Sequence, residues 1–150
     1  MIVVREAREA DLDAWRPLWD GYNAFYGRAG ETALAEEVTR ETWRRFFDPA
    51  QRVFALVAED EGELVGLAHA LYHPLMAHIE PACYLSDLFT RESRRGRGIG
   101  RALIEAVCVR AKADGACRVY WQTQATNAAG RALYDQVARH NGFIVYSREL

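Results

Sequence analysis

A run of arginines and glycines in the middle of the chain has the composition of an anion-binding loop. Residues 91–101 read RESRRGRGIGR and hold five arginines and three glycines. Glycine allows a positive φ and a close approach of a ligand, so several backbone N–H groups can point into one concavity. Guanidinium groups can chelate phosphate oxygens. The segment therefore predicts a site for a pyrophosphate or similar group, although a solvated connecting loop can have the same composition.

The loop is expected to join a strand to a helix. Residues 83–90 are largely apolar and strand-compatible, and from about Gly98 apolar residues recur at helical spacing as far as Val107. The N-terminus of that helix adds unpaired N–H groups and the positive end of a dipole. Two common nucleotide motifs do not fit. Arg101 stands where a dinucleotide fingerprint needs its third glycine, and the Gly-Lys-Ser/Thr of a P-loop is absent.

The spacing of the loop resembles that of a known family. Arg95-Gly96-Arg97-Gly98-Ile99-Gly100 is an instance of Arg/Gln-x-x-Gly-x-Gly/Ala and resembles the acetyl-coenzyme A loop of GNAT-type N-acetyltransferases. The preceding YLSDLF resembles the family's central strand, and Asn127 with Tyr134 resembles its closing helix. The resemblance runs from roughly Val53 to Phe143 and is strongest to the small-amine and diamine acetyltransferase branch.

This resemblance implies an enzyme that uses acetyl-coenzyme A as cosubstrate and needs no metal. It would transfer an acetyl group to the primary amine of a small molecule, a polyamine or a lysine side chain, by direct attack in a ternary complex. The alternative is a non-catalytic sensor that binds acyl-coenzyme A. That alternative arises because Ser86 stands where the branch usually has a glutamate.

The resemblance also implies roles for particular residues. The pyrophosphate would rest on the glycine loop, and the amides of pantetheine would pair with the central strand. Tyr134, seven residues after Asn127, matches the tyrosine that protonates the leaving thiolate. The residues expected to bind the cosubstrate are Leu88, Phe89, Thr90, Arg95, Gly96, Arg97, Gly98, Ile99, Gly100, Arg101 and Asn127.

The acceptor side is less clearly marked. Tyr22 and Tyr26 lie at the end of the first expected helix, where the resemblance places the acceptor groove, and Ser86 and Asp87 lie on the central strand. A serine cannot act as a general base. Strand alternation predicts that Asp87 points to the opposite face from Ser86. The base is therefore left open between Asp87, Glu80 and an ordered water chain.

The elements around the loop predict one mixed α/β domain over residues 1–150. The order is β-α-α-β-β-β-α-β-α-β, and the fold is a mostly antiparallel, splayed sheet flanked by helices, as the GNAT resemblance implies. The strand after the loop helix should run parallel to the central strand through a right-handed crossover. The other expected elements are helices at 11–27 and 34–47, a hairpin at 53–71, a strand at 118–123, a helix from Asn127 to Gly142 and a last strand at 143–146.

Composition narrows the functional class. The 150 residues carry a net charge of -2, with 50% hydrophobic and 27% charged residues, which argues against disorder and against a nucleic-acid partner. The sequence has no membrane-spanning run and no signal-peptide layout, so a cytoplasmic protein is expected.

The three cysteines form no C-x-x-C pair and are expected to be buried thiols; they are Cys83, Cys108 and Cys117. The histidines lack metal-ligand spacing. The apolar C-terminal strand and the resemblance imply a possible homodimer.

Overall fold

The computed structural model describes residues 1–150 and contains one five-stranded sheet in the order β1-β2-β3-β4-β5. The strands are β1 (Ile2–Glu6), β2 (Val53–Asp60), β3 (Glu63–His73), β4 (Ala82–Thr90) and β5 (Arg118–Tyr120). The first four strands pair antiparallel, and β5 runs parallel to β4. The mixed, mostly antiparallel sheet that the sequence predicts is confirmed.

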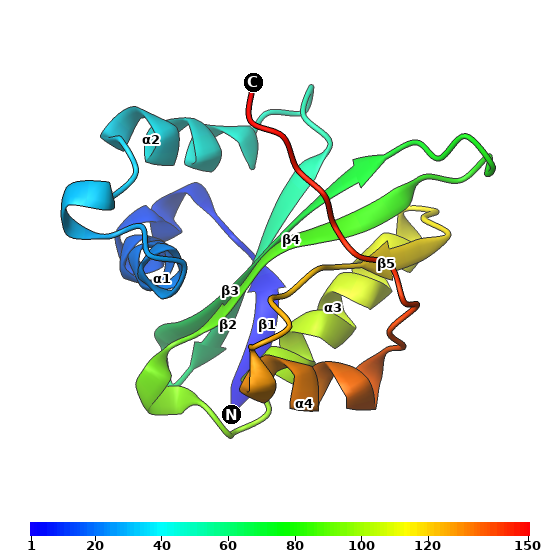
Figure 1. Cartoon of the computed structure of the whole chain (residues 1–150). Coiled ribbons are helices and arrows are strands. Elements are labelled where there is room, and N and C mark those ends of the chain that lie inside the picture. The colour runs from blue at the N-terminus through cyan, green and yellow to red at the C-terminus, as the bar shows by residue number, and fades with distance from the viewer.

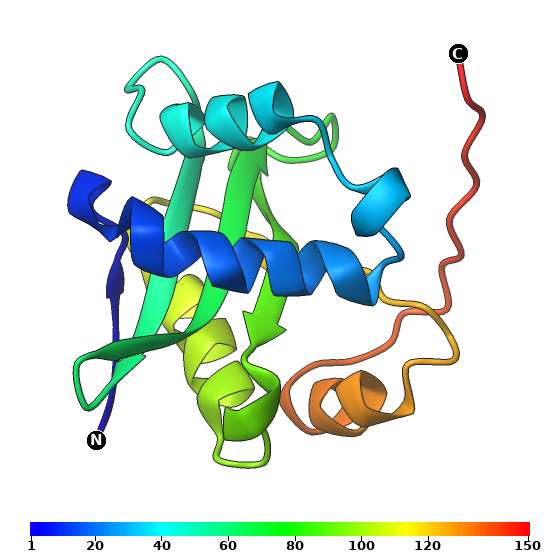
Figure 2. The same ribbon diagram turned by 90° about the vertical axis from the view of Figure 1, so that its left-hand side faces the viewer.

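Two pairs of helices cover the two faces of the sheet (Figures 1 and 2). The helices are α1 (Leu12–Phe25), α2 (Glu36–Arg45), α3 (Ile99–Ala113) and α4 (Ala128–Val137). On one face, α1 and α2 bury an aromatic cluster around Trp15, Trp19 and Trp43. On the other, α3 buries aliphatic residues such as Leu103 and Val107, and α4 packs beside it. The apolar stripe of the first helix is therefore core, as its spacing predicts.

The sheet is split between β4 and β5. These strands pair only through Ala82–Tyr84 and Arg118–Tyr120, so residues 85–90 of β4 have no strand partner on that edge. The chain beyond β5 leaves the sheet and leads into α4 (Figure 1). Helix α3 connects the two strands, which confirms the predicted parallel crossover. The backbone groups of the outer part of β4 therefore face an opening.

A β-bulge in β4 changes which side chains share a face. His69 lies opposite Asp87 and Ala70 opposite Leu85, so Ser86 is the extra residue. Leu85 and Leu88 both pack on the α3 side. The two residues between them lie together, and the Ser86 hydroxyl is 3.4 Å from Asp87 Oδ1. The expectation that Asp87 points away from the face of Ser86 is wrong, because simple alternation fails at a bulge.

The C-terminal end also differs from the expectation. Helix α4 ends at Val137, and residues 143–146 form no strand. Phe143, Ile144, Val145 and Tyr146 are instead 68–87% exposed. A strand needs hydrogen-bonding partners, and within one chain this segment finds none. The strand expected at 118–123 likewise ends at Tyr120, where its pairing with β4 stops.

Three smaller observations complete the fold. Cys83 is buried, but Cys108 is half-buried and Cys117 exposed, so the expectation of buried thiols is wrong for Cys117. None of the helices is both long and apolar enough to cross a lipid bilayer. No group of three or more His, Cys, Asp or Glu side chains is arranged to hold a metal ion.

Candidate active site

The glycine loop forms a concave array of backbone donors at the start of α3. Gly96 and Gly98 have φ values of +77° and +81°, and Gly98 is the N-cap of the helix. The first intrahelical bond is the one that the Ala102 N–H donates to the Gly98 carbonyl. The N–H groups of residues 96–101 donate no hydrogen bond to any protein acceptor. Such an array, at the positive end of a helix dipole, is suited to a diphosphate.

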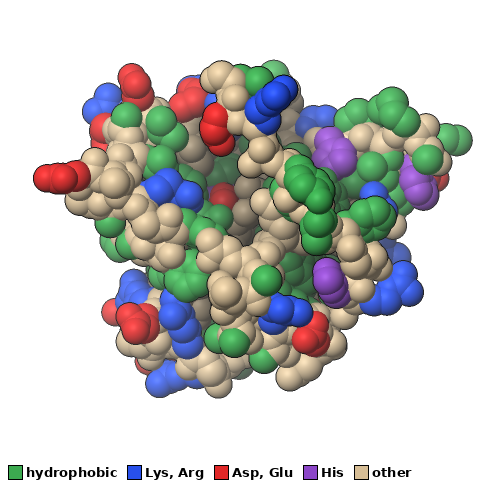
Figure 3. Space-filling view, in the orientation of Figure 1, with side chains coloured by type: hydrophobic (Ala, Val, Ile, Leu, Met, Phe, Trp, Pro, Cys, Tyr) green, Lys and Arg blue, Asp and Glu red, His purple; other side chains and the backbone are tan.

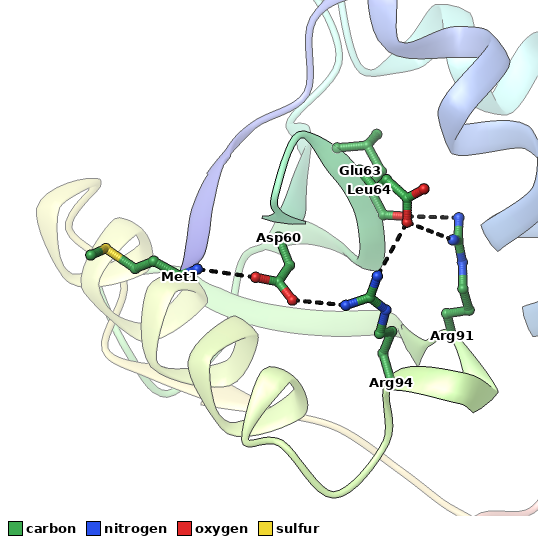
Figure 4. A network of polar contacts seen from close by, with 6 residues as sticks. All are labelled: Met1, Asp60, Glu63, Leu64, Arg91 and Arg94. Atoms are coloured by element: carbon green, nitrogen blue, oxygen red, sulfur yellow. Dashed lines mark hydrogen bonds and ion pairs between the residues drawn. The ribbon is translucent and has the colours of Figure 1, made fainter.

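Two of the five arginines hold the loop in place (Figure 4). Arg94 Nη1 donates to Asp60 Oδ2 at 3.1 Å, and the Met1 amino group lies 3.2 Å from the other oxygen of that carboxylate. Arg91 donates to the Leu64 carbonyl at 3.0 Å, and both arginines reach Glu63. These contacts tie the loop to the turn between β2 and β3. Arg91 and Arg94 are therefore already neutralised.

The other three arginines keep free donors near the array of backbone N–H groups at residues 96–101, which we call the anion nest. Arg95 Nε donates to the Thr90 carbonyl at 3.2 Å, and its guanidinium lies 5.6 Å from the Phe89 ring centre. Arg101 donates to Gln136 Oε1 at 2.6 Å, and Arg97 has no protein partner. The predicted phosphate ligands Arg95, Arg97 and Arg101 are thus the members of the cluster that carry no ion pair.

Close packing at two glycines fixes the start of α3. A Cβ added at Gly66 of β3 would lie 3.0 Å from the side chains of both Ile99 and Leu103. A Cβ at Gly100 would lie 3.1 Å from Leu133 of α4. Both distances are tighter than ordinary van der Waals contact, so larger residues would push α3 away from the sheet or from α4. The nest is therefore held at the mouth of the split.

Helix α4 brings Tyr134 to the other side of the split. Asn127 caps this helix by accepting a hydrogen bond from the Gly130 N–H at 3.1 Å, and its amide donates to Thr123 Oγ1 at 3.0 Å. The last helix therefore begins at Asn127, as the sequence predicts. Tyr134 is half-buried against Trp121, with ring centres 5.5 Å apart. Burial, followed by the nearby Tyr26 hydroxyl, raises the pKa of Tyr134, so this phenol stays protonated at neutral pH.

The side of the split where the acceptor is expected is lined by aromatic residues at the C-terminal end of α1. Tyr22 is buried between Trp19 and Tyr26, and its hydroxyl lies 3.4 Å from the Ser86 carbonyl oxygen. Burial, followed by the Asp87 charge, raises the pKa of Tyr22 far above its usual value. Arg28 covers both tyrosine rings, with its guanidinium 5.9 and 5.5 Å from their centres. Figure 3 shows the face of the molecule on which this side of the split lies, and that face is hollowed.

A buried histidine lies behind this aromatic wall, at a position for which the sequence predicts no functional role. His69 Nδ1 lies 2.9 Å from Asp87 Oδ2, and the Trp15 indole N–H donates to His69 Nε2 at 2.9 Å. Burial by itself raises the pKa of Asp87, but the hydrogen bond and electrostatic attraction of His69, followed by hydrogen bonds from Tyr22 and Ser86, outweigh it and leave that pKa below its usual value. The available signal was a histidine in the middle of the apolar strand GLAHAL.

Glu80, another candidate base, is not part of this site. It is exposed in the connection before β4, and its carbonyl oxygen lies 3.8 Å from Cys117 Sγ. That connection adjoins the closed end of the split, where β4 and β5 are still paired. The structure therefore brings Asp87 to the opening and leaves Glu80 outside it.

Comparison with known proteins agrees with this geometry. The acetyltransferase (GNAT) family matches residues 14–138. The chain belongs to this family. It is 36% identical over 149 residues to D-amino-acid N-acetyltransferase HPA3 of Saccharomyces cerevisiae, a match that covers 98% of this chain and 90% of the yeast protein. It is 30% identical over 146 residues to the uncharacterized N-acetyltransferase YhfO of Bacillus subtilis, with coverages of 95% and 94%.

Solved GNAT structures share the fold. A complex of the aminoglycoside acetyltransferase AAC(6')-Iy with a bisubstrate analogue superimposes with a TM-score of 0.84 at 16% identity, over 100% of this chain and 99% of that one. The family, its relatives and the anion nest together make this protein an acetyl-coenzyme A-dependent N-acetyltransferase.

Proposed function

We propose that this GNAT protein acetylates the primary amine of a small molecule by direct attack within a ternary complex. The observation that carries the proposal is the split between β4 and β5, which has the donor array of residues 96–101 at its mouth and the Asp87 carboxylate on β4. A thioester held at one end and an amine held at the other would meet along the free edge of β4.

The cosubstrate would be held mainly by backbone groups. The N–H groups of residues 96–101, together with Arg95, Arg97 and Arg101, supply donors for its diphosphate. Pantetheine carries two amides, and the unpaired edge of β4 from Leu88 to Thr90 can pair with them as it would with an added strand. This arrangement directs the thioester toward the middle of β4.

For the transfer to occur, the amine must lose protons and the leaving thiolate must gain one. An alkylamine with a pKa of ~10.4 is mostly ammonium at neutral pH, so one proton must leave before attack. Attack forms the C–N bond, and a backbone N–H near Leu88 would bind the oxyanion. The C–S bond then breaks, and Tyr134 donates its phenolic proton to the thiolate. Two protons leave the nitrogen in total, one replacing that of Tyr134 and one reaching solvent.

Charges on the acceptor side indicate which amines fit. Asp87 presents a negative charge for the ammonium group. Arg28 is half-buried, is oriented by the Asn23 amide oxygen at 2.7 Å, and pairs with no carboxylate of the protein. A small zwitterion such as an amino acid carries both complementary charges. The yeast relative is named for D-amino acids. We therefore place amino acids ahead of polyamines and lysine side chains as acceptors.

A thiol-release assay would test this function. Amino acids of both hands, decarboxylated analogues, polyamines and lysine peptides should be offered with acetyl-coenzyme A, and mass spectrometry should identify the acetylated product. Turnover on amino acids supports the proposal. Turnover on lysine peptides alone would contradict the choice of a small acceptor. Tight acetyl-coenzyme A binding without turnover on any amine would favour the alternative, a non-catalytic sensor that Ser86 at the usual glutamate position suggests.

We further propose that two copies associate through their C-terminal segments. Residues 143–146 are apolar and exposed, and β5 is the outermost strand of the sheet, so its edge away from β4 has no partner strand. Residues 143–146 of a second copy could add a strand to that edge. Light scattering should show a dimer for the full chain and a monomer for a chain that ends at His140. A full chain that is monomeric at high concentration would contradict this arrangement.

A further inference from the structure

One oxygen of Asp87 is anchored inside the protein while the carboxylate still reaches the opening. Oδ2 lies 2.9 Å from His69 Nδ1, and the His69 side chain is only 4% exposed. The Asp87 side chain keeps 16% of its surface, and its Oδ1 has the weaker contact with Ser86 at 3.4 Å. The bulge at Ser86 is what turns this carboxylate toward α1. Asp87 is therefore fixed by one oxygen and available through the other.

Trp15 determines which nitrogen of His69 carries the hydrogen. An indole nitrogen can only donate, so His69 Nε2 must be unprotonated where it accepts from Trp15. The neutral ring then carries its hydrogen on Nδ1, facing Asp87 Oδ2. Trp15 is fully buried and His69 is 3% exposed, so water does not compete for this contact. We call the chain of contacts from Trp15 through His69 to Asp87 the relay. In this relay His69 always offers a hydrogen-bond donor to the carboxylate, never an acceptor.

These contacts make Asp87 a persistent anion, which distinguishes it from a general base. A base that works near neutral pH needs a pKa close to that pH, and Asp87 lies well below it. A fixed carboxylate is instead well suited to stabilise positive charge that develops in a transition state. The attacking nitrogen acquires such a charge when the C–N bond forms.

We propose that Asp87 binds the acceptor nitrogen and stabilises the positive charge that develops on it, and that His69, fixed by Trp15, is the residue that positions Asp87. The inference rests on the proposed function and specifies how its acceptor site works. In the step itself the nitrogen lone pair forms the C–N bond and the thioester carbonyl electrons move to oxygen. The C–S bond then breaks and Tyr134 protonates the thiolate; of the two protons that leave the nitrogen, one replaces that of Tyr134 and the other reaches solvent. Asp87 keeps no proton.

Several titratable groups face Asp87 and enter the pH dependence. They are His69 on β3, Tyr22 and Tyr26 on α1, and Tyr84 on β4. The pKa of each tyrosine is raised, first by burial. The tyrosines therefore stay neutral at neutral pH and below. A new acidic limb in the activity profile of a variant would accordingly not come from these tyrosines and would report on Asp87.

The first test removes the charge of the Asp87 side chain without changing the shape of that side chain. Asp87→Asn should lower kcat/KM for the amine by about 10²-fold, as loss of a fixed transition-state charge does, while the Kd for acetyl-coenzyme A stays within about twofold. Glu80→Gln, the matched control at the other candidate carboxylate, should keep wild-type kcat/KM. Wild-type turnover in Asp87→Asn would overturn the proposal.

The second test separates positioning from mere structural support. His69→Phe removes the strongest of the contacts that oppose the effect of burial on Asp87, so Asp87 should take up a proton more readily and kcat should show an acidic limb that recovers as pH rises. His69→Asn keeps an N–H donor and should restore most of the activity. A uniform loss at every pH in His69→Phe, with no rescue by His69→Asn, would show that His69 only fills space and would overturn its assigned role.

Trp15→Phe tests the relay by a measurement that is independent of activity. Nitrogen-15 NMR of the imidazole should report the Nδ1–H form for His69 in the wild type and a mixture of forms in Trp15→Phe. Trp43→Phe is the control, because Trp43 packs 4.7 Å from the Trp15 ring and makes no hydrogen bond to His69. An Nε2–H ring in the wild type would overturn the relay.

Failure of this inference and failure of the proposed function give different results. If the wild-type enzyme binds acetyl-coenzyme A but acetylates no amine, the proposed function fails and the role of Asp87 fails with it. If the wild type turns over and Asp87→Asn does so equally well, only the present inference fails.

Discussion

In the mechanism that we propose, the two ends of the split between β4 and β5 would recognise their ligands in different ways. At the cosubstrate end, one continuous segment supplies the donors, and most of them are backbone N–H groups of residues 96–101. At the acceptor end, side chains from α1, β3 and β4 meet, with Trp15, His69 and Asp87 far apart in sequence. Backbone recognition depends on glycine conformation and tolerates many side chains. Side-chain recognition depends on particular residues, so we expect substrate choice to be set at the acceptor end.

The largest effect should come from filling the nest. Gly98→Glu places a side chain at φ +81° and a negative charge where the diphosphate would lie, so the Kd for acetyl-coenzyme A should rise by about 10³-fold. Gly115→Glu is the control, because Gly115 has φ +85° at the far end of α3 and equal open space. Calorimetry should find intact binding in the control. Intact binding in Gly98→Glu would remove the nest from the account.

A smaller effect, on kcat, is expected at Tyr134, between the cosubstrate end and the acceptor end of the split. Tyr134→Phe removes the proposed proton donor to the thiolate, so kcat should fall by about 10²-fold while the Kd for acetyl-coenzyme A stays nearly unchanged. Tyr146→Phe, on the exposed C-terminal segment, should change neither. Steady-state kinetics with calorimetry measures both quantities. Unchanged turnover in Tyr134→Phe would mean that the thiolate leaves without this residue.

The arginines of the loop should divide into two classes. Arg97→Ala, at a residue without a protein partner, should weaken acetyl-coenzyme A binding by about 10-fold and leave the thermal midpoint unchanged. Arg94→Ala should lower the thermal midpoint, because Asp60 loses a partner at 3.1 Å, and should affect binding less. Calorimetry and thermal unfolding of both variants check the division. Equal effects on affinity would contradict it.

The smallest effect concerns acid stability at the acceptor end. The pKa of Asp87 in the folded protein lies below its usual value, so its ionised form stabilises the fold at pH values above about 4, and this contribution is lost as pH falls through the folded pKa. The difference in thermal midpoint between wild type and Asp87→Asn should therefore be greatest near neutral pH and shrink below about pH 4. A difference that does not change with pH would argue against ionised Asp87.

The same contrast explains what could be predicted from the sequence. The loop at 95–101, its helix and the cap at Asn127 were predictable because each depends on neighbouring residues. The orientation of Asp87 was not, since it follows from a bulge that only the pairing of β3 with β4 reveals. The link between Trp15 and His69 spans 54 positions and leaves no local pattern. The last strand was wrongly predicted because apolar content at 143–146 does not supply a partner.

The central claim is that the N–H groups at the start of α3 hold the cosubstrate at the mouth of the split. A crystal structure of the protein with bound acetyl-coenzyme A tests it most directly. The account predicts that the diphosphate oxygens accept hydrogen bonds from residues 96–101, with pantetheine along the edge of β4 from Leu88 to Thr90 and the thioester pointing toward Asp87. A diphosphate bound anywhere else on the protein would contradict the account.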